Sequence, residues 1–175
     1  VCTYDSSQLT PPTAVADNCG VATVVASPVT LVAGPNTVTW TVTDTSGNIA
    51  TCTQVVTVVD NEVPTITCDA AISVDTDAGV CTYDSSQLTP PTTDDNCAVA
   101  TVVASPATLV AGANTVTWTV TDTSGLIATC EQIVTVLDTQ VPTISCDAAI
   151  SVNADAGLCT YASSQLTPPT TDDNC

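Results

Sequence analysis

Carboxylate and amide side chains gather in short stretches that could hold a metal ion. They occur in the linker Asp60-Asn61-Glu62, the loop Asp94-Asp95-Asn96 and the turn Asp122-Thr123-Ser124. Hard oxygen ligands of this kind suit Ca²⁺, which takes about six to eight of them at ~2.3–2.6 Å. The sequence therefore predicts Ca²⁺ as a cofactor at junctions between domains. The predicted ligands are Asp60, Asn61, Glu62, Asp94, Asp95, Asp122, Asp138, Asp172 and Asp173.

The charge balance strengthens this prediction. The chain has 175 residues, of which 18 are acidic and none is Lys, Arg or His. No side chain can therefore form a salt bridge to a carboxylate, so the counter-charges must be cations or protons. The alternative is that the acids are solvated turn residues. The second linker, Asp138-Thr139-Gln140, has a glutamine where the first has Glu62, which favours that alternative.

Several classes of function are excluded or disfavoured by composition. A formal net charge of −18 repels nucleic acids and anionic membranes, because both are bound through Lys and Arg. No apolar run is long enough for insertion into a membrane. Without His or Lys, and with no cysteine expected to be a free thiolate, the usual catalytic bases and nucleophiles are missing. The sequence predicts a protein that is not an enzyme.

Ten cysteines stand at fixed points of the sequence. In so short a chain they are typical of a disulfide framework, and therefore of an extracellular compartment, secreted or at the cell surface. Ligation of a metal by thiolates is the alternative. Zinc sites usually need paired Cys-x-x-Cys motifs or nearby histidines, and this chain has neither.

The chain is an internal tandem repeat. Residues 80–97 and 158–175 differ at two positions, Val80/Leu158 and Asp84/Ala162, and the chain opens on the same motif. Cys2, Cys81 and Cys159 recur after 79 and then 78 residues, and Trp40 and Trp118 are 78 apart. The predicted domains are a partial repeat at 1–58, a complete one at 59–137 and a partial one at 138–175, taken from a longer array.

Each repeat is predicted to be β-structure. In residues 114–122, Val116, Trp118 and Val120 alternate with threonines, as in a strand with one apolar face. About seven short strands per repeat, separated by turns such as Asp122–Gly125, predict an all-β fold of tandem immunoglobulin-like sandwiches stapled by disulfides. Trp40 and Trp118 are expected in the core.

An ordered set of motifs resembles the hyalin repeat (HYR), an extracellular immunoglobulin-like module. The set is DNEVPTITC (60–68), AGVCTY (78–83), DNC (95–97), AGANTVTWTVTDTSG (111–125) and ATC (128–130). Asp69 and Asp147 replace the usual proline after the first cysteine of the repeat, and Leu126 stands where asparagine is usual. The resemblance implies adhesion or structural repetition outside the cell.

Two cysteine pairings stay open. In an immunoglobulin-like topology the first and last strands run parallel, so Cys68 should meet Cys130, which leaves Cys81 to close a short loop with Cys97. The same rule pairs Cys2 with Cys19 and Cys159 with Cys175, while Cys52 and Cys146 have partners outside the chain. The alternative joins Cys52 to Cys68 and Cys130 to Cys146.

Two functional hypotheses follow. The first is a structural array that forms an extracellular stalk, fibre or filament, whose partners are neighbouring repeats or copies of itself. The second is a cell-adhesion module that binds a glycan or a protein. Near-identity of the repeats favours the first, because a rod needs the same packing many times. The exposed Thr and Ser side chains could also carry O-linked sugars, which predicts a glycoprotein.

Overall fold

The computed structural model describes residues 2–175, and their regular structure is almost entirely β. The only helices among these residues are three short 3₁₀ turns, η1 (Ser6–Gln8), η2 (Ser85–Gln87) and η3 (Ser163–Gln165). The all-β prediction is confirmed. The immunoglobulin-like arrangement of the sheets and the three repeat boundaries stay predictions.

Contacts divide the chain into two compact units. One comprises residues 1–68, 90–103 and 118–130, and the other comprises residues 69–89, 104–117 and 131–175. This division differs from the division by sequence repeat, because segments distant in sequence pair with one another inside each unit.

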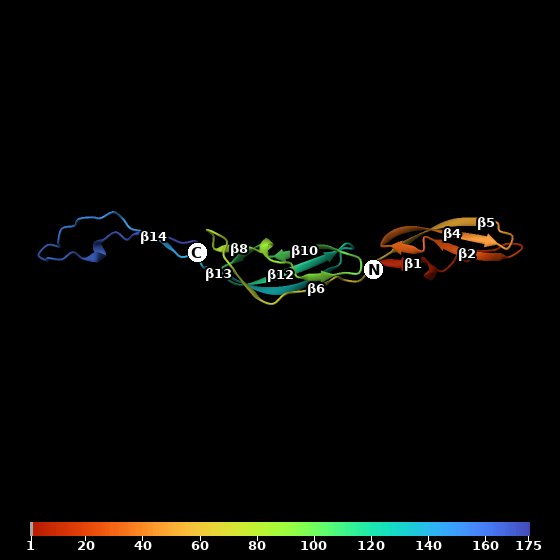
Figure 1. The fold of residues 1–175 in the computed structure, drawn as a ribbon, viewed down its shortest axis with the longest axis horizontal. Coiled ribbons are helices and arrows are strands. Elements are labelled where there is room, and N and C mark those ends of the chain that lie inside the picture. The colour runs from red at the N-terminus through yellow and green to blue at the C-terminus, as the bar shows by residue number, and fades with distance from the viewer. Residues whose placement is uncertain (1) are drawn as a thin grey trace. The chain divides into compact units, whose positions relative to one another are not determined.

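In the first unit, three antiparallel strands form a sheet in the order β2 (Val21–Ser27), β4 (Gly34–Asp44), β5 (Ile49–Val58), drawn in orange in Figure 1. β5 therefore lies at the edge of this sheet. Two smaller antiparallel pairs belong to the same unit. β1 (Thr3–Asp5) pairs with β3 (Thr30–Val32), and β6 (Thr65–Thr67) pairs with β9 (Thr92–Asp94).

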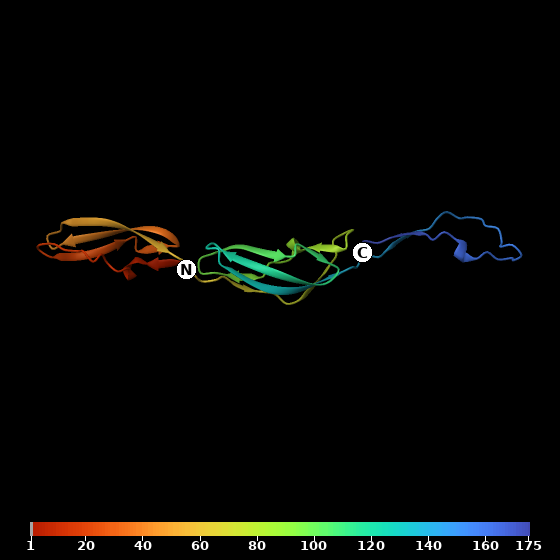
Figure 2. The ribbon, with the colours of Figure 1, turned by 180° about the vertical axis from the view of Figure 1, so that it is seen from behind.

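A four-stranded sheet has the order β10 (Val99–Ser105), β12 (Gly112–Asp122), β13 (Ile127–Leu137), β7 (Ile72–Asp75). Its long strands run through both units, and Figure 2 shows them from behind in green and teal. The last pair is parallel, with Ile72 opposite Val134 and Val74 opposite Val136. The expected parallel pairing with the last strand of the repeat is thus present, but its partner is the second strand, β7, because the first strand, β6, pairs with β9.

The second unit also contains two short antiparallel pairs. β8 (Thr82–Asp84) pairs with β11 (Thr108–Val110), and β14 (Thr143–Ser145) pairs with β15 (Thr170–Asp172). β14, β15 and η3 are the only regular elements between residues 138 and 175. The intervening segment 146–162 contains no strand.

The core follows the alternation of apolar and threonine side chains. Val116 and Val120 are fully buried on β12 and Trp118 is 3% exposed, while the threonines between them are half-buried. Trp40 is likewise 3% exposed, packs with Leu31 and Val38, and donates its indole N–H to Gln54 Oε1 at 2.8 Å. Both tryptophans are core residues, as predicted, since each is 3% exposed.

Candidate metal centre and disulfides

Three of the predicted ligands, Asp60, Asp95 and Asp122, lie together in the first unit. One carboxylate oxygen of each lies within 4.8 Å of the others. They come from three separate segments: the linker after β5, the loop after β9 and the turn between β12 and β13. Strand pairing brings them together, because β6 and β9 are neighbours and the turn caps the long strands.

Asp122 is the most buried of the three, at 2% exposure. Its Oδ1 accepts hydrogen bonds from the backbone N–H groups of Ser124 and Leu126, both at 2.8 Å, which fixes the tight turn. Gly125 has a φ of +87°, which a residue with a side chain would adopt only with strain. The other oxygen, Oδ2, is buried and has no hydrogen-bond partner among the described residues.

Asp95 is half-buried, and, as in Asp122, one of its carboxylate oxygens accepts hydrogen bonds while the other has no partner. Oδ2 accepts from the backbone N–H groups of Cys97 and Ala98 at 2.8 and 2.9 Å. Oδ1 is covered and lacks a partner within the described part of the chain, as does Oδ1 of the adjacent Asn96. Each carboxylate therefore uses one oxygen to hold its own loop and leaves one oxygen unsatisfied.

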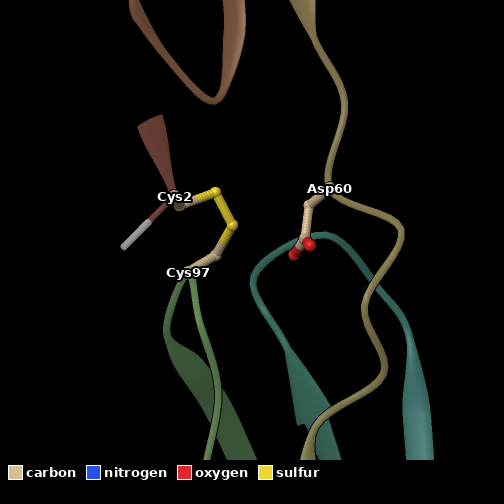
Figure 3. A group of neighbouring side chains, drawn as sticks. All are labelled: Cys2, Asp60 and Cys97. Atoms are coloured by element: carbon tan, nitrogen blue, oxygen red, sulfur yellow. A yellow bond between two sulfur atoms is a disulfide. The ribbon is translucent and has the colours of Figure 1, made fainter. Parts of the chain in front are cut away.

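Asp60 completes the group. Its Oδ2 accepts a hydrogen bond from Ser124 Oγ at 3.0 Å, and its Oδ1 accepts from the backbone of Glu62 at 3.2 Å. Figure 3 shows its carboxylate beside the disulfide between Cys2 and Cys97, above the teal turn that joins β12 and β13. A sulfur of each cysteine lies within 4.8 Å of a carboxylate oxygen of Asp60, but disulfide sulfurs are not metal ligands here.

The electrostatics of this group are unfavourable without a cation. Placing carboxylates this close and partly out of water costs free energy, since like charges repel and each loses hydration. No side-chain cation exists to offset that cost. A hard divalent ion would satisfy the unpartnered oxygens and balance the charge, so the residues present fit Ca²⁺.

The remaining predicted ligands are not part of this group. Asn61, Glu62 and Asp94 are exposed, and Asp94 contributes its backbone carbonyl to Thr65 Oγ1 at 3.0 Å. Asp138, Asp172 and Asp173 are exposed too, and they form no such group within residues 2–175.

Three disulfides join the chain: Cys68–Cys130, Cys2–Cys97 and Cys81–Cys175. The first is a predicted pair, and it joins the segment between β6 and β7 to the last strand of the repeat, β13. It contradicts the alternative pairing of Cys52 with Cys68 and of Cys130 with Cys146. Disulfides are typical of oxidising compartments, so these three bonds support the oxidising environment that the sequence predicts.

The predicted disulfides between cysteines that are close in the sequence were wrong. Cys81 is bonded to Cys175 rather than Cys97, and the pairs Cys2–Cys19 and Cys159–Cys175 are absent. The reason lies in the sheets: β8, directly after Cys81, pairs with β11, whereas β9, shortly before Cys97, pairs with β6. The prediction that Cys81 and Cys97 close a short loop did not take these different strand partners into account. Cys19, Cys52, Cys146 and Cys159 are free and exposed.

The two unexpected bonds obey one rule. Cys2 and Cys81 occupy the same position of successive repeats, as do Cys97 and Cys175. Their bonds span 95 and 94 residues, which is one repeat plus the short loop. Each bond therefore ties a repeat to the next one along the sequence. Sequence reasoning missed this because it paired cysteines by proximity in the chain.

Comparison with known proteins adds no family assignment. No family model matches the chain, and no curated protein is significantly similar to it. None of the helices among residues 2–175 is long and apolar enough to cross a membrane.

Proposed function

We propose that this chain is a structural tandem-repeat protein that forms part of an extracellular stalk, fibre or filament. The observation that carries the proposal is the recurrence of the repeat-to-repeat disulfide, once as Cys2–Cys97 and again in the same register as Cys81–Cys175. A disulfide that recurs in every repeat indicates a role in linking successive repeats rather than a role at a single binding site. The hyalin-repeat resemblance and its immunoglobulin-like domains agree with this role.

Mechanically, such a bond limits how far two successive repeats can separate. The polypeptide linker and the disulfide are two covalent connections between the same repeats, so a pulling force is shared and one cleavage does not sever the array. The absence of Lys and Arg also removes every cleavage site for trypsin-like proteases, which suits exposure outside a cell.

Ca²⁺ is proposed as the ion that completes the junction. Asp60, Asp95 and Asp122 would hold it, with Asn96 Oδ1 as a further oxygen donor. Asp95, Asn96 and Asp122 each have an unpartnered oxygen, and a carboxylate oxygen of Asp60 lies within 4.8 Å of those of Asp95 and Asp122. The ion would supply positive charge that the chain lacks. Asp60 comes from the linker, whereas Asp122 comes from the body of the complete repeat, so binding would fix the linker on that repeat.

Peptide mapping and microscopy of the native material test the structural role. Digestion before an acidic residue, without reduction, should release Cys2–Cys97 and Cys81–Cys175 as linked peptides, and negative-stain images should show regularly beaded fibres. Isolated particles that bind a glycan or protein, with cysteines linked only inside repeats, would instead support the adhesion module.

A further inference from the structure

The outer side of the sheet β2-β4-β5 (Figure 1) carries a regular array of small side chains. Its inner side is identified by burial, because Val38 and Trp40 on β4 are 0% and 3% exposed and Val24 and Ala26 on β2 pack against them. The residues between them point to the other side. We call that outer side the neutral face. It comprises Thr23, Val25 and Ser27 on β2, Thr37, Thr39, Thr41 and Thr43 on β4, and Ile49, Thr51, Thr53 and Val55 on β5.

Strand pairing sets these side chains in rows across the sheet. Thr41 on the central strand, for example, lies opposite Val25 on β2 and Thr51 on β5. Solvent reaches the face, since Val25, Ile49 and Val55 are 54%, 66% and 69% exposed. A contiguous exposed surface that combines apolar side chains with threonine methyl groups indicates a site of interaction.

The neutral face carries no charge, although the chain has a net charge of −18. Asp44 is the only charged residue between positions 18 and 59. Its carboxylate accepts the backbone N–H groups of Ser46 and Asn48, both at 2.8 Å, and so belongs to the turn at the end of β4. Two copies of so acidic a chain repel one another wherever their carboxylates meet. The neutral face is a surface on which two copies can approach closely.

The second repeat differs from the first at this surface. Over the ten residues of β5, the corresponding strand β13 differs only at Thr53/Glu131 and Val55/Ile133. Glu131 is exposed and its neighbour Gln132 is buried, so the carboxylate lies on the outer side of β13. A carboxylate there would have to lose its water if another sheet packed over it, which costs free energy. Two nearly identical strands thus differ in charge on their outer side.

We infer that the neutral face docks on the neutral face of a second copy of this chain, as two sheets packed face to face. Both copies contribute the same residues, which is the symmetric arrangement of most dimers. Packed sheets lie about 10 Å apart with interdigitating side chains, and Thr, Val and Ile suit such a contact. Threonine hydroxyls both donate and accept, so those of the two copies can satisfy one another.

The size of the face predicts a weak contact. Three strands with β5 of ten residues make a face of at most about 34 by about 14 Å at the usual strand rise and spacing. Two such faces bury about 1,000 Å² together, slightly less than most stable interfaces. The contact therefore suits side-by-side association of filaments, where many copies are aligned. In that respect the inference rests on the proposed function, to which it adds a lateral partner.

Sedimentation equilibrium of the full chain tests the contact. The four free cysteines are first replaced by serine so that no disulfide can link two copies: Cys19, Cys52, Cys146 and Cys159. A reversible equilibrium between monomer and dimer should appear as the protein concentration approaches the millimolar range. Raising the ionic strength from about 0.01 M to about 0.15 M should tighten the dimer, because the screening length falls from about 30 Å to about 8 Å and the copies repel less.

Thr53→Glu places a carboxylate on the neutral face and should raise the Kd of the dimer about tenfold, because the charge would be covered by the other sheet. Glu131 shows that this strand position accommodates Glu, and a thermal melt checks that the variant is folded. Thr129→Glu is the matched control. It adds the same charge at an exposed position of β13, outside the neutral face, and should leave the Kd unchanged.

The reverse substitution, Glu131→Thr, should enlarge the assemblies. It gives each chain a second uncharged sheet face, so species larger than dimers should form.

Several results would overturn the inference: monomers at every concentration, a dimer weakened by salt, equal effects of the two Glu variants, or dimers alone from Glu131→Thr. A monomer that is retained on a neutral polysaccharide matrix would also overturn it and would indicate a glycan ligand for this face. None of these outcomes alters the Cys2–Cys97 and Cys81–Cys175 peptides, so the proposed function is judged separately.

Discussion

Cys68, which precedes β7, and Cys130, which lies within β13, are bonded in register with these parallel strands, since each stands four residues before a member of the facing pair Ile72 and Val134. The disulfide therefore continues the β7–β13 pairing rather than bracing a loop. Its Cα atoms are 5.8 Å apart, within the usual range for a disulfide.

We expect Cys130→Ser to lower the free energy of unfolding by about 4 kcal/mol, the chain-entropy value for a closed loop of this size. Urea denaturation followed by tryptophan fluorescence measures it. Cys146→Ser is the matched control, because Cys146 is free and exposed, and it should leave the stability of the monomer unchanged. Equal stabilities for the two variants would contradict the prediction.

Millimolar Ca²⁺ should raise the melting temperature of the chain, because an ion that binds only the folded state stabilises it by about 2.7 kcal/mol at 100 times its Kd. Asp122→Asn should abolish this rise, since Asn keeps the turn-forming oxygen but removes the buried charge. Differential scanning calorimetry with Ca²⁺ and with chelator makes the comparison.

The control for the calcium experiment is Asp44→Asn. Asp44 occupies the position of Asp122 in the first repeat and binds its own turn through Ser46 and Asn48, but it belongs to no carboxylate group within residues 2–175. The response to Ca²⁺ should survive this substitution. A rise of the same size in the Asp122→Asn variant would refute the proposed site.

Acid should destabilise the chain through its turn carboxylates. Hydrogen bonds from the Asn48 side chain and backbone lower the pKa of Asp44 below the usual 3.8, and backbone N–H donors do the same for Asp5 and Asp84. A lowered folded-state pKa stabilises the fold above the unfolded value, and this stability is lost as pH falls from about 3.8 through the folded pKa. Thermal melts between neutral pH and strong acid should show the loss below that value, and Asp44→Asn should weaken it.

Asp84 should stabilise the 3₁₀ turn η2, because its Oδ1 accepts the backbone N–H of Ser86 at 2.8 Å. The third repeat has Ala162 at this position, and η3 has no side-chain cap. Asp84→Ala should therefore speed amide hydrogen exchange at Ser86, and Ala162→Asp should slow it at Ser164. Unchanged exchange in both would show that the cap does not hold the turn.

Part of the candidate site was predictable from sequence. The turn signals and the absence of any cation pointed to Asp60, Asp95 and Asp122. What the sequence could not show is that Asp94, next to Asp95, would lie outside the group. Adjacent side chains on an extended segment point to opposite sides, so only the register of β9 on β6 decides which carboxylate faces the turn.

The alternation of Val, Trp and Thr along 114–122 by itself determined the β-structure and the buried face, because side chains of a strand alternate between its two sides. The cysteine count and the repeat likewise determined that disulfides would form and recur. The tertiary structure alone decided the partners. The strands beside Cys81 and Cys97 pair with different neighbouring strands. Each of these cysteines is therefore bonded across a repeat boundary and not to the cysteine nearest to it in the sequence.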